Sequence, residues 1–410
     1  MFTKIENSKY LFGSIDYITL WSIGTLLSIL RWADIILVGI VIYELTSSPL
    51  QVAILIIIRF IPLIMFGFIS GTISDNINRR TGFIIGLFIM AGLSLVLSFI
   101  IYYHNVTPLI LQCHVLINGI FWAFENSTRK SLIIDITPSS LYSKSITIDS
   151  ISTNVTRFIG PLISALYFNN LNIINLLIFT TTIYFICACS CFIFTRKTLY
   201  TNTHFNNLNI YKLFKSSVIM LNNNKYLLNI FVITIIFNIW AYPYLSMLPV
   251  IGKNVLKYSV QDISILASIE GLGSLIGVLI ILIYNKSKFY NLYYVGGTIL
   301  TIICSFLFYF TFNYASSLII LFISGIGSGF FGVMQNVLVA LYSPNKVKGA
   351  MFGILTMCIG FASLGYLHIG LLSLWLGVKY AIMLISVEGI LVLSFTIYLS
   401  PNLINKNIKS

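Results

Sequence analysis

Charged residues are scarce along this chain. Only 9% of its 410 residues are charged, and 11 Asp and Glu stand against 24 Lys and Arg. Hydrophobic residues make up 58%, and a water-soluble fold cannot hide that much apolar surface because folding still leaves a large area facing solvent. The mean hydropathy of +0.96 therefore favours a chain that is dissolved in a lipid bilayer.

Patterns that indicate several other classes of protein are also missing. No Gly-x-x-x-x-Gly-Lys-Ser/Thr loop is present, so we do not expect this chain to hydrolyse ATP. No loop carries a His, Asp and Glu constellation with catalytic spacing, which argues against an enzyme. A receptor would be expected to carry a soluble signalling domain, and the sequence shows none. The six cysteines lie in apolar segments and predict neither a metal site nor redox chemistry. We expect no cleavable signal peptide before the first apolar run, which begins near Ile18.

Apolar runs of about 20 residues, the length that crosses a hydrocarbon core of ~30 Å, recur from end to end. They predict an all-α membrane protein with twelve transmembrane helices. The predicted spans are residues 18–42, 50–73, 82–103, 107–128, 145–168, 172–194, 227–251, 260–284, 290–311, 315–341, 348–372 and 378–400.

Basic residues gather on one side of the predicted topology. With twelve spans, 18 of the 24 Lys and Arg fall on the side that holds both termini. Short loops rich in Lys and Arg stay in the cytoplasm. We therefore expect a multi-pass protein of the bacterial inner membrane with both termini cytoplasmic, and we interpret the net charge of +13 as a topology signal rather than a nucleic-acid surface.

The longest polar stretch divides the chain into two similar parts. We expect an N-terminal six-helix bundle over residues 1–195, a central cytoplasmic loop with an amphipathic helix over 196–226, and a C-terminal six-helix bundle over 227–410. Two pseudo-symmetric bundles are a common design of alternating-access transporters, whose substrate site lies between the halves near the midplane. We expect the protein to work as a monomer in the bilayer, on a small-molecule substrate.

The loop after the second span has a distinctive pattern. Gly71, Asp75, Arg79 and Arg80 follow the order Gly, three residues, Asp, three residues and two basic residues. This pattern resembles the signature loop of the major facilitator superfamily, although two inner positions hold Asn where the family usually has a basic residue and a Gly. The resemblance implies the major facilitator fold.

The same resemblance implies that this loop latches one conformation of the two halves. Asp75 would face the start of span eleven, and Arg79 and Arg80 would pair with acids at neighbouring helix ends, such as Glu125 or Asp149. The alternative is a solvated loop whose basic residues only reflect the excess of Lys and Arg in cytoplasmic loops.

Further stretches resemble the branch that includes enterobactin-type siderophore exporters and macrolide efflux proteins. They are residues 43–49, 59–62, 149–161, 325–336 and 344–353, so they cover both halves. Gly160 and Pro161 in span five also resemble the core of the motif of drug/proton antiporters, and Pro161 would bend that span. The resemblance implies efflux that is driven by the proton gradient, with no other cofactor and no metal.

Each charge inside a span costs at least ~2.5 kcal/mol on insertion scales, so each one needs a structural or functional reason. Arg31, Arg59 and Arg157 together suit an anionic substrate, and Trp32 and Trp122 are candidates for the walls of its cavity. In the alternative interpretation each arginine is neutralised locally. Arg31, for example, can pair with an acid three residues later in the same span.

Three intramembrane acids are candidate proton carriers, namely Asp34, Glu270 and Glu388. No Lys or Arg lies inside a span of the C-terminal half, and a carboxyl group without a cationic neighbour in a low-dielectric medium can carry a proton. A packing role is the alternative for each acid, and for His114 and His368. The leading hypothesis is proton-coupled efflux of a drug-like compound, siderophore or other metabolite; uptake or lipid flipping is the alternative.

Overall fold

The computed structural model describes residues 11–74, 79–103, 106–138, 141–170, 173–193, 219, 221, 224–284, 287–311, 313–343 and 348–400. Within these residues all regular structure is helical. The N-terminal half, called the N-half below, contains η1 (Leu11–Gly13), α2 (Ile15–Thr46), α3 (Pro49–Ser74), α4 (Arg79–Tyr102), α5 (Pro108–Ile136), α6 (Tyr142–Asn170), α7 (Ile173–Ser190) and η3 (Cys191–Ile193).

The C-terminal half, called the C-half, begins after the chain segment that contains the predicted central loop. Most of that loop, with its predicted amphipathic helix, lies outside the described residues. The C-half contains α9 (Lys225–Ile236), η4 (Phe237–Ala241), η5 (Pro243–Met247), α10 (Leu248–Val250), η6 (Ile251–Val255), α11 (Val260–Ile283), η7 (Ser287–Phe289), α12 (Tyr290–Phe308), α13 (Tyr314–Tyr342), α14 (Lys348–Gly360), α15 (Ala362–Leu376) and α16 (Val378–Leu399).

The twelve predicted spans are recovered as twelve membrane-crossing segments. Ten segments of the described chain are long and apolar enough to cross a membrane by length and composition. The other two are α7, which is shorter, and α6, which is 29 residues long but carries charged residues. The fold is therefore the predicted all-α arrangement of a multi-pass membrane protein.

The seventh span is broken where the sequence predicts a continuous helix. After α9 the chain makes a π-helical turn at η4, a 3-10 turn at η5, the short α10 and a second π-helical turn at η6. Pro243 is the first residue of η5 and Pro249 the second residue of α10, and both interrupt a regular helix because proline has no N–H and its ring clashes with the preceding turn. The break places Tyr242 at a bend in the middle of the bundle.

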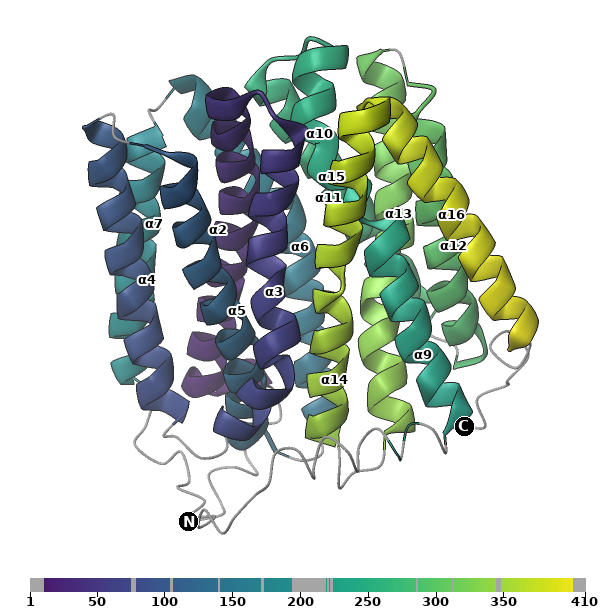
Figure 1. Cartoon of the computed structure of the whole chain (residues 1–410). Helices are drawn as coiled ribbons and strands as arrows, with labels where there is room; N and C mark the ends of the chain where they lie inside the picture. The colour runs from purple at the N-terminus through teal and green to yellow at the C-terminus, as the bar shows by residue number, and fades with distance from the viewer. Residues whose placement is uncertain are drawn as a thin grey trace, which may run out of the picture.

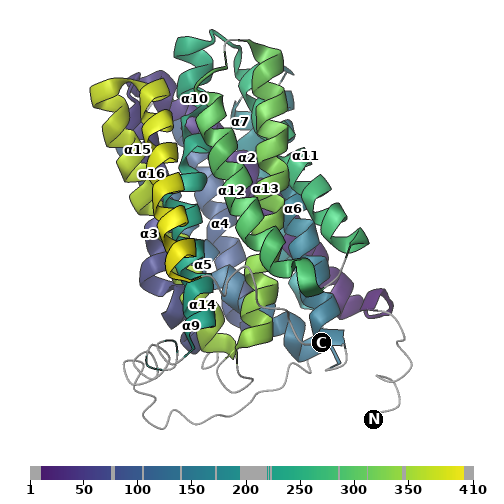
Figure 2. The same cartoon turned by 90° about the vertical axis from the view of Figure 1, so that its right-hand side faces the viewer.

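The two halves lie side by side and touch along two seams (Figure 1). In one seam α6 of the N-half packs against α11 of the C-half, and in the other α3 packs against α14 and α15. Figure 2 shows α15 and α16 beside each other at one edge of the molecule. Smaller contacts across the interface join α6 to α13, and α2 and α3 to the broken seventh span, so these elements are the ones that can form a site between the halves.

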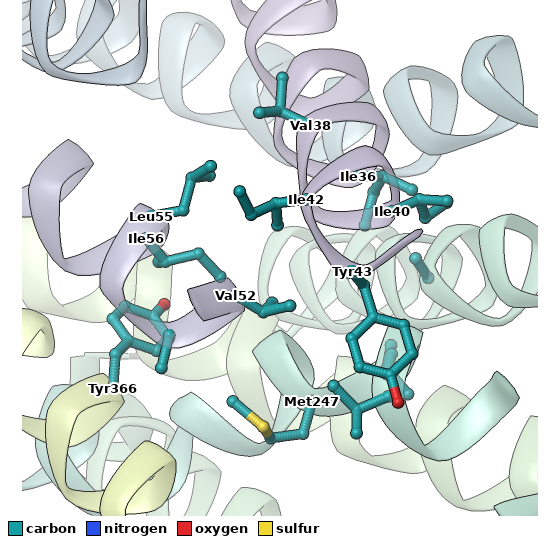
Figure 3. Packing of buried hydrophobic residues seen from close by; sticks show 14 of the residues in the cluster. Ile36, Val38, Ile40, Ile42, Tyr43, Val52, Leu55, Ile56, Met247 and Tyr366 are labelled. Atoms are coloured by element: carbon teal, nitrogen blue, oxygen red, sulfur yellow. The ribbon is translucent and has the colours of Figure 1, made fainter. Parts of the chain in front are cut away.

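Apolar side chains join the halves at one end of the bundle. We call the end that holds Ile15 and Leu399 the termini end, and the opposite end the α10 end. Tyr43 and Val52 of the N-half and Met247 and Tyr366 of the C-half belong to one buried cluster (Figure 3). Lys253 also forms an ion pair with Glu44 across the halves near the α10 end.

The α6–α11 seam depends on a glycine. A Cβ atom at Gly271 would lie 2.4 Å from the backbone C atom of Arg157 and 2.4 Å from the backbone N atom of Phe158. We expect Gly271→Ala to force the two helices apart and to lower stability by about 1–3 kcal/mol, as overpacking does. The thermal midpoint of the detergent-solubilised protein measures this loss.

Gly296 in α12 provides the matched control because a Cβ there meets nothing within 4 Å. Gly296→Ala is expected to leave the midpoint unchanged or to raise it, since Ala has the higher helix propensity. Equal midpoints for the two variants would show that the seam tolerates a wider spacing.

Candidate functional site

A pocket lies between the halves in the middle of the bundle. Its walls come from α2, α3 and α6 of the N-half and from η5, α11 and α15 of the C-half, and they include Trp32, Phe60, Arg157, Tyr242, Glu270 and Tyr366. The cavity measures about 60 Å³, several times the ~10–15 Å³ that one buried water needs. The walls are mainly apolar, with one cation and one acid among the lining residues.

Arg157 and Glu270 form an ion pair across the α6–α11 seam at the edge of this pocket. One terminal nitrogen of Arg157 lies 2.6 Å from Oε1 and 2.8 Å from Oε2 of Glu270. Both side chains are largely buried, at 11% and 5% exposure. A buried pair of this kind is stable only while both partners stay together, because removal of either leaves an uncompensated charge in a low-dielectric medium.

Polar groups of the C-half complete the surroundings of this ion pair. Arg157 also donates to the hydroxyl of Tyr242 at 3.1 Å and to Oγ of Ser274 at 3.3 Å. Ser328 donates to Oε1 of Glu270 at 2.7 Å. The Nε atom of Arg157 is buried without a hydrogen-bond partner, so the guanidinium retains a donor that this arrangement does not use.

Aromatic rings lie against the same guanidinium. Its central carbon is 5.4 Å from the ring centroid of Trp32 and 5.3 Å from that of Tyr242. Rings at this distance attract a cation through their quadrupole. Arg157 therefore lies between an N-half ring and a C-half ring, so a relative movement of the halves changes its environment.

Arg59, Asp34 and His114 form a second group inside the N-half. Arg59 of α3 pairs with Oδ2 of Asp34 at 2.5 Å, and Nε2 of His114 lies 3.2 Å from Oδ1 of the same carboxylate. The sequence predicts that Asp34 pairs with Arg31, and the structure shows a different partner. Arg59 is almost fully buried, so it is neutralised locally and does not line the pocket.

A third group lies toward the termini end of the N-half. Arg31 donates to Oε2 of Glu125 at 2.7 Å, and Arg129 donates to Oε1 of the same carboxylate at 2.6 Å. Arg129 also forms an ion pair with Asp149 of α6. Arg31 lies 4.7 Å from the ring centroid of Trp122. Arg129 thus pairs with two of the three carboxylates of the predicted latch, Glu125 and Asp149.

The predicted latch loop is described only in part. Asp75 lies outside the described residues; Gly71 and Arg79 lie in α3 and α4, and their surroundings are not described. Arg80 donates to the main-chain oxygens of Cys191 and Phe192, at 3.0 to 3.1 Å. Its partners are therefore the carbonyl groups at the end of the sixth span, whereas the sequence predicts acids such as Glu125 or Asp149.

Gly160 and Pro161 lie where α6 crosses α2. A Cβ atom at Gly160 would lie 2.5 Å from Cβ of Trp32 and 2.8 Å from the carbonyl oxygen of Ile29, so this glycine allows the close contact of the two helices. Pro161 lies inside α6 and lines the pocket. Pro161 is therefore at the wall of the pocket, and Gly160 lies beside it at the contact with α2.

Glu388, the third predicted proton carrier, lies away from the pocket. Its Oε2 atom is 2.8 Å from Nε2 of His368 and accepts from Nε1 of Trp240 at 3.1 Å. Glu388 and His368 are about 40% exposed, at 42% and 39% respectively. The three candidate carriers thus differ in their partners. Asp34 contacts an arginine and a histidine, Glu270 an arginine, and Glu388 a histidine.

Arg129, Ser274 and Ser328 are members of these networks that the sequence does not identify. The sequence assigns Arg129 to a cytoplasmic loop because the predicted span ends at residue 128. In fact α5 continues to Ile136, so Arg129 lies one turn after Glu125 on a buried helix. The spacing of four residues between the two charges was the available signal.

In the described part of the chain, no group of three or more His, Cys, Asp and Glu side chains is arranged to hold a metal ion. The charged groups of the site are instead paired with one another. Such an arrangement can bind a charged solute, exchange a proton and break an ion pair between the halves, all of which are steps of transport.

Comparison with known proteins gives the family. Residues 20–367 match the model of the Major Facilitator Superfamily, and the chain belongs to this family of membrane transporters. No curated protein matches the sequence.

Solved structures of transporters share the fold at low sequence identity. The nucleoside transporter NupG is 13% identical, with a TM-score of 0.68 over 96% of this chain and 100% of that one. A D-xylose-proton symporter is 13% identical, with a TM-score of 0.74 over 96% and 99%. The human organic anion transporter MFSD10 is 13% identical, with a TM-score of 0.69 over 93% and 99%.

Proposed function

We propose that this protein exports a small organic anion across the bacterial inner membrane by alternating access, with the proton gradient as its energy source. The observation that carries the proposal is the Arg157–Glu270 ion pair, which joins the two halves at the wall of the pocket. The protein would work as a monomer with both termini in the cytoplasm, without a cofactor or a metal.

Charge balance supports an anionic substrate. The paired arginines of the N-half are Arg31, Arg59, Arg129 and Arg157, and the carboxylates that pair within this half are Asp34, Glu125 and Asp149. The first three arginines are satisfied by these acids, whereas Arg157 obtains its counter-charge from the C-half. When the halves separate around the pocket, an anion can take the place of Glu270, and the free Nε donor of Arg157 offers a further hydrogen bond.

The same exchange couples transport to protons. A carboxylate that has lost its arginine partner in a low-dielectric medium is costly as an anion, so an unpaired Glu270 would take up a proton. Export driven by the gradient requires the proton and the substrate to cross in opposite directions. Glu270 would therefore take up its proton from the outer side as the substrate leaves Arg157, and would release it into the cytoplasm when the ion pair re-forms before the next substrate binds. Asp34 is a weaker candidate proton carrier because its partners Arg59 and His114 belong to the same half. A relative movement of the two halves therefore leaves these contacts in place.

The direction and the substrate class rest on sequence resemblance. The stretches similar to siderophore exporters and macrolide efflux proteins favour efflux, and they include the segment that contains Arg157. The fold itself is shared with transporters of nucleosides, a sugar and organic anions, so the fold alone determines neither the direction of transport nor the substrate class. Uptake is the second candidate, and the same assay distinguishes it.

Proteoliposomes with an imposed pH gradient test the proposal. We expect gradient-driven accumulation of a carboxylate-bearing substrate by the wild type, and loss of accumulation in Glu270→Gln. Exchange of labelled for unlabelled substrate without a gradient is expected to persist in Glu270→Gln, because Gln still accepts a hydrogen bond from Arg157.

Asp262→Asn is the matched control, since Asp262 is an exposed acid at the start of the same helix. It should leave accumulation unchanged. Accumulation that a protonophore does not affect, or equal accumulation by Glu270→Gln and the wild type, would reject proton coupling through Glu270. Accumulation that reverses with the gradient in the uptake direction would reject efflux.

A further inference from the structure

The Trp240, His368 and Glu388 group has a setting unlike that of the central ion pair. Glu388 lies midway along α16, about 15 Å from either end of this helix at ~1.5 Å per residue. Its side chain is 42% exposed, against 5% for Glu270. An ionisable side chain near the middle of a membrane span is costly and marks a functional site by default.

The open side of this group points away from the pocket. Tyr366 of α15 lines the pocket, and His368 lies two residues later, which is about 200° around a helix. The neighbours of His368 on its own face, Leu364, Leu367 and Leu371, are exposed. Exposed apolar residues at mid-helix are what a bilayer solvates, so His368 and Glu388 open toward the hydrocarbon of the membrane.

The backbone brings the three residues together. A Cβ atom at Gly389 would lie 2.8 Å from Cβ of Trp240, so this glycine lets α16 approach η4 closely. Trp240 itself lies in the π-helical turn of η4, and π-helical turns occur frequently at functional sites. The ring nitrogens of Trp240 and His368 both contact Oε2 of Glu388. Among the described residues no donor reaches the other oxygen, Oε1.

We propose that Trp240, His368 and Glu388 form a second ligand site on the membrane-facing side of the C-half, which binds the protonated amine of a lipophilic amine dissolved in the bilayer. An ammonium group would donate to the open Oε1 of Glu388 and compensate its charge. The exposed leucines of α15 and the exposed Leu391 of α16 would contact the apolar body. An anion would meet the carboxylate instead, so the site selects cations.

The position of Trp240 also connects this site to the pocket. Trp240 precedes Tyr242 by two residues, and Tyr242 accepts a hydrogen bond from Arg157. An amine on Oε1 of Glu388 therefore binds next to the chain segment that holds the central ion pair. The site can change the transport rate without being on the transport path, and it does not depend on the direction or the proton coupling of transport.

Binding in the absence of any gradient tests the site. The protein is placed in nanodiscs of phosphatidylcholine with tritiated dodecyldimethylamine, a twelve-carbon tertiary amine, and protein-free nanodiscs give the lipid background. We expect saturable binding that is weakened at least tenfold in Glu388→Gln and unchanged in Glu270→Gln. Dodecanol, which has the same chain and no charge, should not compete.

Each other outcome contradicts the proposal. Equal binding by Glu388→Gln and the wild type would show that the acid does not hold the amine, and loss in Glu270→Gln alone would place the ligand in the central pocket. Competition by phosphatidylethanolamine added to the nanodiscs would assign the amine to a lipid head group and overturn the dissolved amine as its source. Asp262→Asn, which lies at the start of α11 outside both sites, is expected to bind normally, and an unchanged thermal midpoint of Glu388→Gln controls for loss of folding.

Discussion

Arg157→Gln is expected to reduce both gradient-driven transport and substrate exchange by about 100-fold or more. Breaking a buried ion pair from one side costs ~3–5 kcal/mol because the remaining charge is left without compensation, and each 1.4 kcal/mol corresponds to about a factor of ten. Arg157 is also the group that we propose to hold the substrate. Initial rates in proteoliposomes, normalised to the amount of inserted protein, measure the effect.

A double variant distinguishes lost function from lost folding. Arg157→Gln/Glu270→Gln removes one charge of each sign, so its thermal midpoint should recover most of the loss seen in Arg157→Gln, while transport stays absent. Arg157→Lys keeps the charge but cannot contact Glu270, Tyr242 and Ser274 in one planar fork, and we expect intermediate rates. Transport by Arg157→Gln at the wild-type rate would remove the ion pair from the mechanism.

Arg129→Gln is expected to have the largest effect on stability. Arg129 is 3% exposed and pairs with both Glu125 and Asp149, so its loss leaves Asp149 without the cation that the structure gives it. We expect a loss of about 3–5 kcal/mol. The folded fraction on size exclusion in mild detergent, and the thermal midpoint of that fraction, report it.

Arg80→Gln is the matched control because, among the described residues, Arg80 contacts main-chain carbonyl oxygens rather than acids, and its replacement strands no buried charge there. Adding Asp149→Asn to Arg129→Gln should restore part of the stability, since Glu125 keeps Arg31 as a partner. If Arg129→Gln were as stable as Arg80→Gln, charge compensation would not be what holds these helices together.

The architecture follows from the sequence because hydrophobic length is a strong local signal. A run of about 20 apolar residues has few alternatives to a membrane-crossing helix. The predicted spans agree with the helices except for α5, which continues to Ile136 beyond the predicted end at 128, and for two segments that are interrupted. The interruption after Gly360 and the π-helical turns around Pro243 were missed. A single proline or bend does not specify which neighbouring groups will form hydrogen bonds with the backbone N–H and C=O groups that the break leaves unpaired.

The pairing of charges could not be predicted in the same way. Arg31 and Asp34 have the spacing of a helical pair, yet each has a better partner on another helix, Glu125 and Arg59 respectively. Which cation meets which acid depends on how the helices pack, and tertiary geometry competes with local spacing. The sequence indicated that Arg157 and Glu270 each need a partner or a function to lie in the membrane. It did not indicate that they pair with each other.

The dependence of Arg157 on an acid of the other half has a consequence for biosynthesis. A ribosome completes α6 at Asn170, 90 residues before α11 begins at Val260, so the first bundle enters the membrane with one guanidinium that none of its own described carboxylates neutralises. Until the second bundle arrives, that side chain has to remain in contact with water, head groups or an insertion factor. The same ion pair that we propose to take part in transport would thus form first as the step that completes assembly.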